Sequence, residues 1–155
     1  MWLSPSTRPK ARQSAVLTGY SDSMKKRLAQ GGEVRAAERP SGYQMRAGAF
    51  GQDRGGAIPP NLIRAANTES NSSYVRGCRA AGLPVHPARF PRALPDFFVR
   101  LCTDPGDTVM DCFGGSGTLA ESARSHGRFW ILVERIFEYL QSTAVRLGEP
   151  IPQMR

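Results

Sequence analysis

A glycine-rich run, Asp111-Cys112-Phe113-Gly114-Gly115-Ser116-Gly117-Thr118, carries the clearest chemistry in this sequence. Glycines in a turn between a strand and a helix let the backbone approach a ligand, and the helix start offers unpaired N–H groups. Glu134 comes 17 residues after Gly117, close to the spacing at which an acid accepts hydrogen bonds from both ribose hydroxyls. The run and the acid together predict a site for a ligand that contains a nucleoside.

Three ligand classes use turns of this kind. A phosphate-binding loop needs a lysine after its last glycine, and residue 118 is threonine. A dinucleotide fingerprint needs the spacing GxGxxG, which this run does not have. Asp111 suits S-adenosylmethionine, because a carboxylate attracts the ammonium and sulfonium groups of that ligand. The alternative is a tight turn without a ligand, in which Asp111 simply ends a buried strand.

The elements that position these residues follow one another in the order helix, strand, helix, strand, helix. The strands are expected at 108–112 and 129–133 and the last two helices at 119–125 and about 136–147. The first helix follows Pro91, and its apolar residues recur at helical spacing: Leu94, Phe97, Phe98, Leu101 and Cys102. We expect Phe97, Phe98 and Leu101 of this face, and Trp130, to lie in the core, and the order of elements predicts a parallel α/β sheet.

The chain divides by composition into an irregular basic region, 1–66, and an α/β part, 67–150. Residues 1–54 hold ten Lys/Arg against four Asp/Glu, whereas residues 55–155 hold eleven against nine, and the net charge is +8. Ser21 or Asp22 can cap a short helix that ends at Gly31-Gly32, and residues 31–61 show neither helical nor strand periodicity. The charge favours a polyanion partner such as nucleic acid. A solvated arginine-rich surface is the alternative.

Several classes of protein are poorly supported by this composition. The longest apolar run, Phe129–Val133, is far shorter than the ~20 residues of a membrane helix, and the N-terminus has no apolar signal-peptide region. Three cysteines without CxxC spacing, with only two histidines, predict neither a disulfide framework nor a metal site. We therefore expect a protein without metal, in the reducing cytoplasm.

Spaced motifs over roughly residues 2–147 make the chain resemble the C-terminal part of a bacterial amino-group DNA methyltransferase, and most of all the restriction-modification enzymes that methylate cytosine at N4. These motifs are Tyr20-Ser21-Asp22, Arg39-Pro40-Ser41-Gly42, 55–62, Asn67–Asn71, His86–Pro91, Leu94–Phe98, Asp104–Asp107, the glycine-rich run and Glu134. The resemblance implies a partial Rossmann-like methyltransferase fold that uses S-adenosylmethionine. It also implies duplex DNA as the substrate, with residues 1–66 in or beside the target-recognition part.

The resemblance also implies which residues bind the cofactor. The family segment at the methionine end of the cofactor corresponds to His86–Pro91, with Phe90 at its centre. The adenosylmethionine turn corresponds to Asp111, Phe113, Gly114, Gly115, Ser116 and Gly117, and the ribose-binding acid to Glu134. The sequence departs from the closest subgroup at Cys112 and at Gly117. His86, which precedes a proline, we interpret as a residue that shapes the link rather than as a catalytic group.

A catalytic residue is not identified, because the family's Ser/Asn/Asp-Pro-Pro-aromatic tetrapeptide is absent from this sequence. The single Pro-Pro pair reads Ile58-Pro59-Pro60-Asn61. In the family that tetrapeptide holds the target amine and stacks on the flipped base. We therefore expect this chain by itself to be inactive, and a missing N-terminal half on another polypeptide is a candidate partner. An adenine-N6 methyltransferase and a non-catalytic remnant that binds cofactor or DNA are the alternatives.

Overall fold

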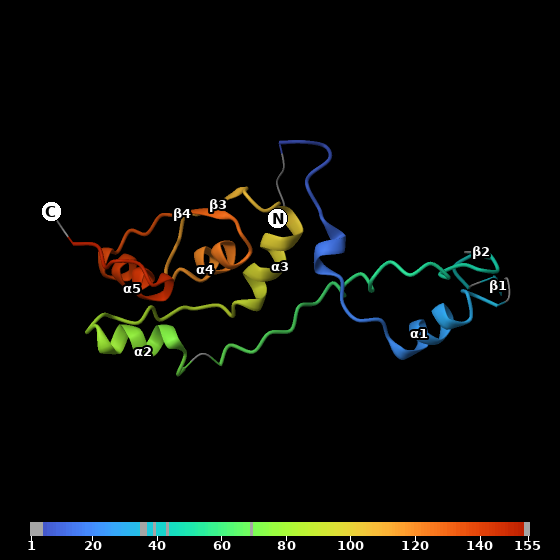
Figure 1. Ribbon diagram of the computed structural model, residues 1–155, viewed down its shortest axis with the longest axis horizontal. Coiled ribbons are helices and arrows are strands. Elements are labelled where there is room, and N and C mark those ends of the chain that lie inside the picture. Colours follow the sequence, from blue (N-terminus) through green and yellow to red (C-terminus); the bar gives the residue numbers. More distant parts are fainter. Residues whose placement is uncertain (1–4, 35–36, 39, 43, 69, 154–155) are drawn as a thin grey trace. The chain divides into compact units, whose positions relative to one another are not determined.

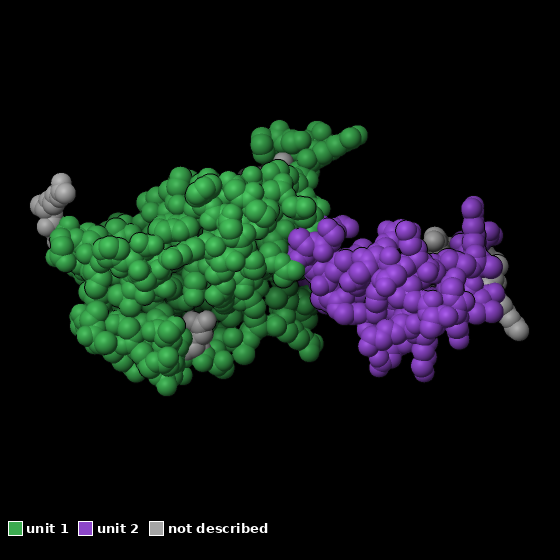
Figure 2. All heavy atoms as spheres, in the orientation of Figure 1, with its two compact units in different colours: residues 1–12, 62–155 green, residues 13–61 purple. Residues whose placement is uncertain are grey.

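The computed structural model describes residues 5–34, 37–38, 40–42, 44–68 and 70–153 (Figure 1). The chain forms two compact units, which we call the α/β unit, residues 1–12 and 62–155, and the small unit, residues 13–61 (Figure 2). This division differs from the expected one at its N-terminal end. Residues up to 12 go with the α/β unit because Lys10 pairs with Asp104 and Asp107, and the Arg12 backbone N–H donates to the Leu101 carbonyl.

The centre of the α/β unit is a parallel pair of strands, β3 (Thr108–Asp111) and β4 (Phe129–Leu132). Their register pairs Thr108 with Phe129 and Asp111 with Leu132. The crossover between them is helix α4 (Thr118–Ser125), which contacts both strands (Figure 1). A parallel pair needs such a crossover, so the expected strand–helix–strand order and the parallel sheet are confirmed.

Three further helices complete this unit: α2 (Ser73–Ala80), α3 (Ala93–Cys102) and α5 (Phe137–Leu147). The Ser72 side chain caps α2 by accepting a hydrogen bond from the Val75 backbone N–H, as a serine at this position commonly does. Helix α2 packs against α5, and α3 packs against α4 (Figure 1). The buried cluster under α2 consists of Tyr74, Val75 and Cys78, packed against Leu83, Val85 and Val145.

Because both strands are continuous apolar runs, the sequence predicts that they are buried, and this prediction is wrong for one face of the sheet. Four apolar residues on this face are exposed: Met110 by 58%, Phe129 by 67%, Ile131 by 52% and Val133 by 48%. The residues that alternate with them along the strands, among them Trp130, are half-buried. Alternate strand residues point to opposite faces, and among the described elements only α4 makes extensive contact with the strands. One face is therefore covered by helix and the other is open, whereas parallel sheets commonly carry helices on both faces.

The buried face of α3 also differs from the predicted one. Pro95 and Val99 are its buried residues, whereas Phe98 is 45% and Leu94 37% exposed. The expected core position of Phe98 is therefore wrong, and Phe97 and Leu101 are half-buried. The apolar stripe on this helix is wider than the part that α4 covers, and periodicity alone does not choose which edge of a wide stripe is buried.

The small unit contains a short 3-10 helix, η1 (Gln13–Val16), helix α1 (Asp22–Ala29), and strands β1 (Ala37–Glu38) and β2 (Gln44–Met45). Ser21 caps α1, as expected, by accepting from the Met24 backbone N–H. The strands pair antiparallel, and Thr18 bridges Ala57 through two backbone hydrogen bonds of 2.9 Å. The expectation of no strand within 31–61 is therefore wrong, because two-residue strands are too short to show periodicity.

No helix in the described part of the chain is both long enough and apolar enough to cross a membrane.

Asp96 joins α3 to α4, and its loss should destabilise the α/β unit. Its carboxylate accepts from Ser122 Oγ at 2.6 Å and from His126 Nε2 at 3.2 Å, and pairs with Arg92. We expect Asp96→Ala to lower the free energy of unfolding by about 1.5–3 kcal/mol in urea denaturation, the range for hydrogen bonds to a charged group. Asp22→Ala is the control, since the Asp22 side chain is 93% exposed. Equal changes in the two variants would show that Asp96 does not hold these helices together.

The same network predicts a pH dependence of stability. Partial burial raises the pKa of Asp96, but the Ser122 hydroxyl, Arg92 and His126 lower it more, so the net pKa lies below the ordinary 3.8. The contribution of Asp96 is therefore complete above the unfolded pKa and is lost as the pH falls through the lower, folded pKa.

Candidate functional site

The glycine-rich run forms the turn between β3 and α4, at the carboxyl end of the parallel strands. Residues 114–118 are buried, whereas Phe113 is 91% exposed. Asp111 ends β3, and its Oδ1 atom accepts a hydrogen bond of 3.0 Å from the Phe113 backbone N–H. The carboxyl end of parallel strands is the edge at which open α/β folds bind ligands. The turn therefore lies between a strand and a helix, as the sequence predicts.

Two glycines are required by the close packing of this turn. Gly117 has φ +72°, and a Cβ atom there would lie 2.5 Å from Cγ2 of Thr143 on α5. A Cβ atom at Gly114 would overlap the Leu132 side chain on β4. Neither position admits a side chain without movement of its neighbour. The glycines thus allow the turn to lie directly on the strand and the last helix.

Glu134 reaches back from the end of β4 to the turn. Its Oε2 atom accepts from the Gly115 backbone N–H at 2.8 Å, and its Oε1 atom accepts from the Ile136 backbone N–H at 2.9 Å. These amides, that of Ile136 foremost, hold the pKa of Glu134 below its usual value of 4.5. The carboxylate is therefore ionised at neutral pH. Because it has about four acceptor positions, it retains acceptor capacity for ligand hydroxyls.

Helix α5 fixes the outer side of the turn. Thr143 Oγ1 donates to the Gly115 carbonyl at 3.0 Å, and Arg146 Nε donates to the Ser116 carbonyl at 2.7 Å. Arg146 also pairs with Glu121 of α4 at 2.8 Å and lies over the Tyr74 ring, 4.4 Å from its centroid. The main chain of the turn is thus held from β4, α4 and α5, as a preorganised binding site requires.

His86 belongs to the segment that the resemblance assigns to the methionine end of the cofactor, and its ring lies beside the turn. Its ring lies 3.3 Å from the position that a Cβ atom would take at Gly115, and it packs edge-on against Tyr139 with a centroid separation of 4.4 Å. Its Nδ1 atom lies 2.8 Å from the Ala88 carbonyl and therefore donates to it, since a carbonyl only accepts. That bond directs Nε2 toward the turn. The His-Pro pair was visible in the sequence, but its proximity to a turn 29 residues later was not.

The predicted site residues are brought together in part. Asp111, Gly114–Gly117 and Glu134 form one site, joined by hydrogen bonds through the turn. Phe90 lies on the link before α3 and is 41% exposed, and no hydrogen bond or ring contact joins it to the turn within the described residues. Phe113 belongs to the turn, but its side chain is exposed to solvent. Of the two predicted aromatic residues, only Phe113 is therefore shown to be part of the turn.

The arrangement places two carboxylates beside the hydrogen-bonded main chain of the turn. Asp111 ends β3 and Glu134 follows the end of β4 by two residues, so their negative charges lie at the same edge of the sheet. Such a site attracts a cationic group and accepts hydrogen bonds from neighbouring hydroxyls. Among the residues that the structure describes, no group of three or more His, Cys, Asp or Glu side chains is arranged to hold a metal ion.

Comparison with known proteins gives a consistent set of matches. A family model described as DNA methylase matches residues 2–145. The Type II methyltransferase M.PvuII of Proteus hauseri is 42% identical over 146 residues, which cover 94% of this chain and 43% of that protein. M.BglI of Bacillus subtilis, also a Type II methyltransferase, is 48% identical over 56 residues, 36% of this chain and 16% of that protein.

A solved structure supports the fold. The cytosine-N4-specific PvuII DNA methyltransferase superposes with a TM-score of 0.55 at 44% identity, over 62% of this chain and 34% of that one. The mixed helix and strand architecture is therefore that of the α/β, Rossmann-like methyltransferase fold. The chain spans less than half the length of the curated relatives that it matches.

Proposed function

Because this chain belongs to the DNA methylase family of N6- and N4-amino methyltransferases, we propose that it forms the S-adenosylmethionine-binding part of an enzyme that methylates N4 of cytosine in duplex DNA, within a restriction-modification system. The observation that carries the proposal is the Glu134 carboxylate hydrogen-bonded to Gly115 of the turn, beside Asp111 at the end of β3. Similarity to a cytosine-N4-specific enzyme over most of the chain favours cytosine N4 over adenine N6.

Each site residue has a distinct role in this proposal. Asp111 faces the positively charged methionine end of the cofactor, and Glu134 accepts from the ribose hydroxyls. Gly114, Gly115, Ser116 and Gly117 form the backbone cradle, and the exposed rings of Phe90 and Phe113 contact the apolar and aromatic parts of the ligand. The cofactor itself supplies an electrophilic methyl group on a sulfonium. The donor set fits it, because two carboxylates match one cationic end and one pair of hydroxyls.

We further propose that the protein acts in the cytoplasm, where cysteines stay reduced. Its three cysteines are free thiols, of which Cys78 is buried and Cys112 exposed.

Methyl transfer tests this function directly. We expect the 155-residue chain alone to transfer no tritiated methyl group to mixed-sequence duplex DNA, because its sequence lacks the tetrapeptide that holds the target base. Adding a second polypeptide that carries a Ser-Pro-Pro-aromatic tetrapeptide from a related cytosine-N4 enzyme should restore transfer. Label well above a no-protein control with the chain alone would contradict this expectation.

Nucleoside analysis of the labelled DNA separates the alternatives. N4-methylcytosine supports the proposal, and N6-methyladenine supports the adenine-N6 alternative instead. No label in the mixture, together with retained binding of cofactor or DNA, supports the non-catalytic remnant.

Binding to DNA should be electrostatic and dependent on salt. The small unit holds seven Lys/Arg against four Asp/Glu, and Lys25 and Lys26 lie exposed on α1. If both contact phosphates, replacing them with glutamine should reduce the slope of log affinity against log salt by about two. Exposed arginines of α2, changed in Arg76→Gln/Arg79→Gln, serve as the control in a mobility-shift series. If the lysine variant keeps the wild-type slope of log affinity against log salt, these lysines do not contact phosphates and belong to a solvated surface.

A further inference from the structure

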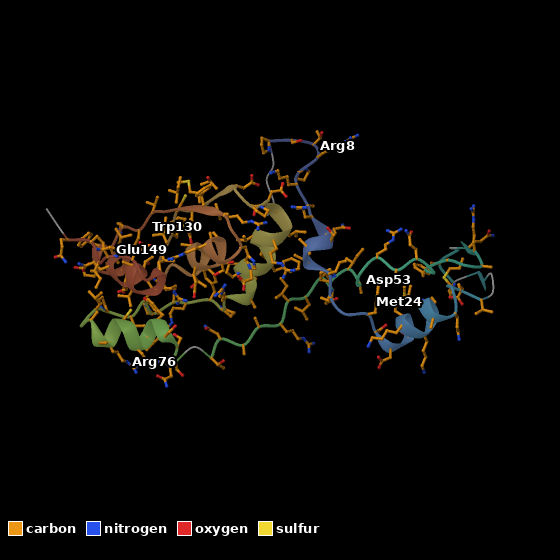
Figure 3. The ribbon with its side chains drawn as sticks, viewed as in Figure 1. Arg8, Met24, Asp53, Arg76, Trp130 and Glu149 are labelled. Atoms are coloured by element: carbon orange, nitrogen blue, oxygen red, sulfur yellow. The ribbon has the colours of Figure 1, made fainter. Side chains whose placement is uncertain are left out.

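The small unit contains a partly open cavity that the cofactor site does not use. Its volume is about 600 Å³, within the range of small-ligand sites. Helix α1 contributes Met24 to the wall of the cavity. The segment that follows β2 contributes Gln52 and Arg54, which are the neighbours of Asp53 in the sequence (Figure 3 labels Met24 and Asp53). Phe50 and Ile58 add apolar surface, and both are exposed, by 49% and 69%.

Phe50 has an unusual backbone conformation for a bulky residue. Its φ is +62°, and it is the only described non-glycine residue with positive φ. Positive φ in an aromatic residue is strained, and such strain persists only where the surrounding structure enforces it. An apolar ring that is half exposed gains little from burial. Burial of the ring therefore does not account for this conformation.

The loop that carries Phe50 is tightly anchored. Glu33 N donates to the Ala49 carbonyl and Gly48 N to the Glu33 carbonyl, both at 2.8 Å. A Cβ atom at Gly32 would lie 2.5 Å from the Gly48 carbonyl oxygen, so the two backbones are in direct contact. These contacts hold the backbone of the loop, and they leave the ring of Phe50 half exposed at the cavity.

Cationic and polar groups surround the ring. The Arg27 guanidinium lies 5.7 Å from the ring centroid, within cation–π range, and pairs with Glu33. Arg54 lines the cavity. Tyr20 also lines the cavity, and its hydroxyl donates to Asp53 Oδ1 at 3.0 Å and accepts from the Arg54 N–H at 2.9 Å. A ligand in this cavity would contact the half-exposed ring of Phe50, the Arg54 side chain and the polar residue Tyr20.

We propose that Phe50 is a base-stacking residue, on which an unpaired nucleobase of DNA lies in this cavity while Arg54 contacts the adjoining phosphate. The inference rests on the proposed function in one respect, that DNA is the substrate. Aromatic side chains stack on bases of any sequence, and arginines beside them pair with the backbone. The net positive charge of this unit complements DNA, whereas an apolar peptide would offer the Arg54 side chain no anionic partner.

The test compares variants of the full 155-residue chain on two duplexes. One duplex carries 2-aminopurine opposite an abasic site, so that this base is unpaired, and the other is fully paired. Wild type should quench 2-aminopurine fluorescence and prefer the unpaired duplex. Phe50→Gly removes the ring and accepts positive φ without strain, and thermal unfolding of the variant checks that it is folded. We expect it to abolish quenching and to weaken binding to the unpaired duplex by about tenfold or more.

Phe50→Trp should retain quenching and affinity, and Val34→Ala, at an exposed apolar residue outside the cavity lining, should match wild type. Wild-type affinity and quenching in Phe50→Gly would overturn the stacking proposal while leaving DNA as the substrate. Failure of the wild-type chain to bind either duplex at low salt would overturn both the stacking proposal and the DNA partner. Displacement of the unpaired duplex from wild type by an apolar peptide, but not by single-stranded DNA, would assign the cavity to a peptide.

Discussion

Replacing Gly117 with alanine should lower the free energy of unfolding by about 2–5 kcal/mol. Left-handed backbone costs a non-glycine residue about 1–2 kcal/mol. Overpacking of a filled site adds about 1–3 kcal/mol, and the new Cβ would lie 2.5 Å from Cγ2 of Thr143. Thr143 cannot simply turn away, because its hydroxyl holds the Gly115 carbonyl. Urea denaturation of both proteins measures the difference.

Gly148 provides the matched control for this substitution. It has nearly the same φ, +66°, but no atom lies within 4 Å of the position of its Cβ. Gly148→Ala should therefore show only the backbone cost of about 1–2 kcal/mol. Equal losses in the two variants would mean that the turn is not packed against α5 as tightly as described.

Glu134→Ala should weaken S-adenosylmethionine binding at least tenfold. The substitution removes a charged acceptor, and hydrogen bonds to charged groups contribute about 1.5–3 kcal/mol each, which corresponds to about 10–150-fold in affinity. It also frees the Gly115 N–H that the carboxylate holds at 2.8 Å. Calorimetric titration measures the change, and Glu138→Ala, an exposed acid in the first turn of α5, is the control.

The pKa of Glu134 adds a pH dependence to the same measurement. Because the amides of Ile136 and Gly115 hold this pKa below 4.5, the carboxylate stays ionised throughout the neutral and mildly acidic range. Its contribution to affinity should therefore be constant from neutral pH downward and decline only below the ordinary glutamate pKa. Wild-type affinity in Glu134→Ala would show that Glu134 does not bind the ribose.

Much of the local structure could be predicted because it depends on interactions between residues that are close together in the sequence. Ser21 and Ser72 cap the helices that follow them, and Gly148 ends α5 in a left-handed conformation, as capping preferences imply. The two strands, the crossover helix and the glycine turn also follow from patterns only a few residues long. Asp111 and Glu134 come together because parallel strands bring their carboxyl ends to one edge.

The remaining features depend on contacts between distant segments, which no local pattern encodes. Phe98 and Met110 are apolar and periodic, yet both are exposed because no described element covers them. His86 reaches the turn only because α2 packs on α5 and Tyr74 accepts from the His86 N–H. Phe50 lies in a segment without periodicity, where positive φ in an aromatic residue cannot be anticipated from residue preferences.

Calorimetric titration of the 155-residue chain with S-adenosylmethionine tests the central claim most directly. A site made of Asp111, the glycine turn and Glu134 should bind this cofactor and S-adenosylhomocysteine saturably, with one molecule per chain. ATP should not bind, because the two carboxylates repel its phosphates and the turn has no lysine at residue 118. Absence of saturable binding up to about 1 mM cofactor, or equal binding of ATP, would contradict the assignment of this turn as the cofactor site.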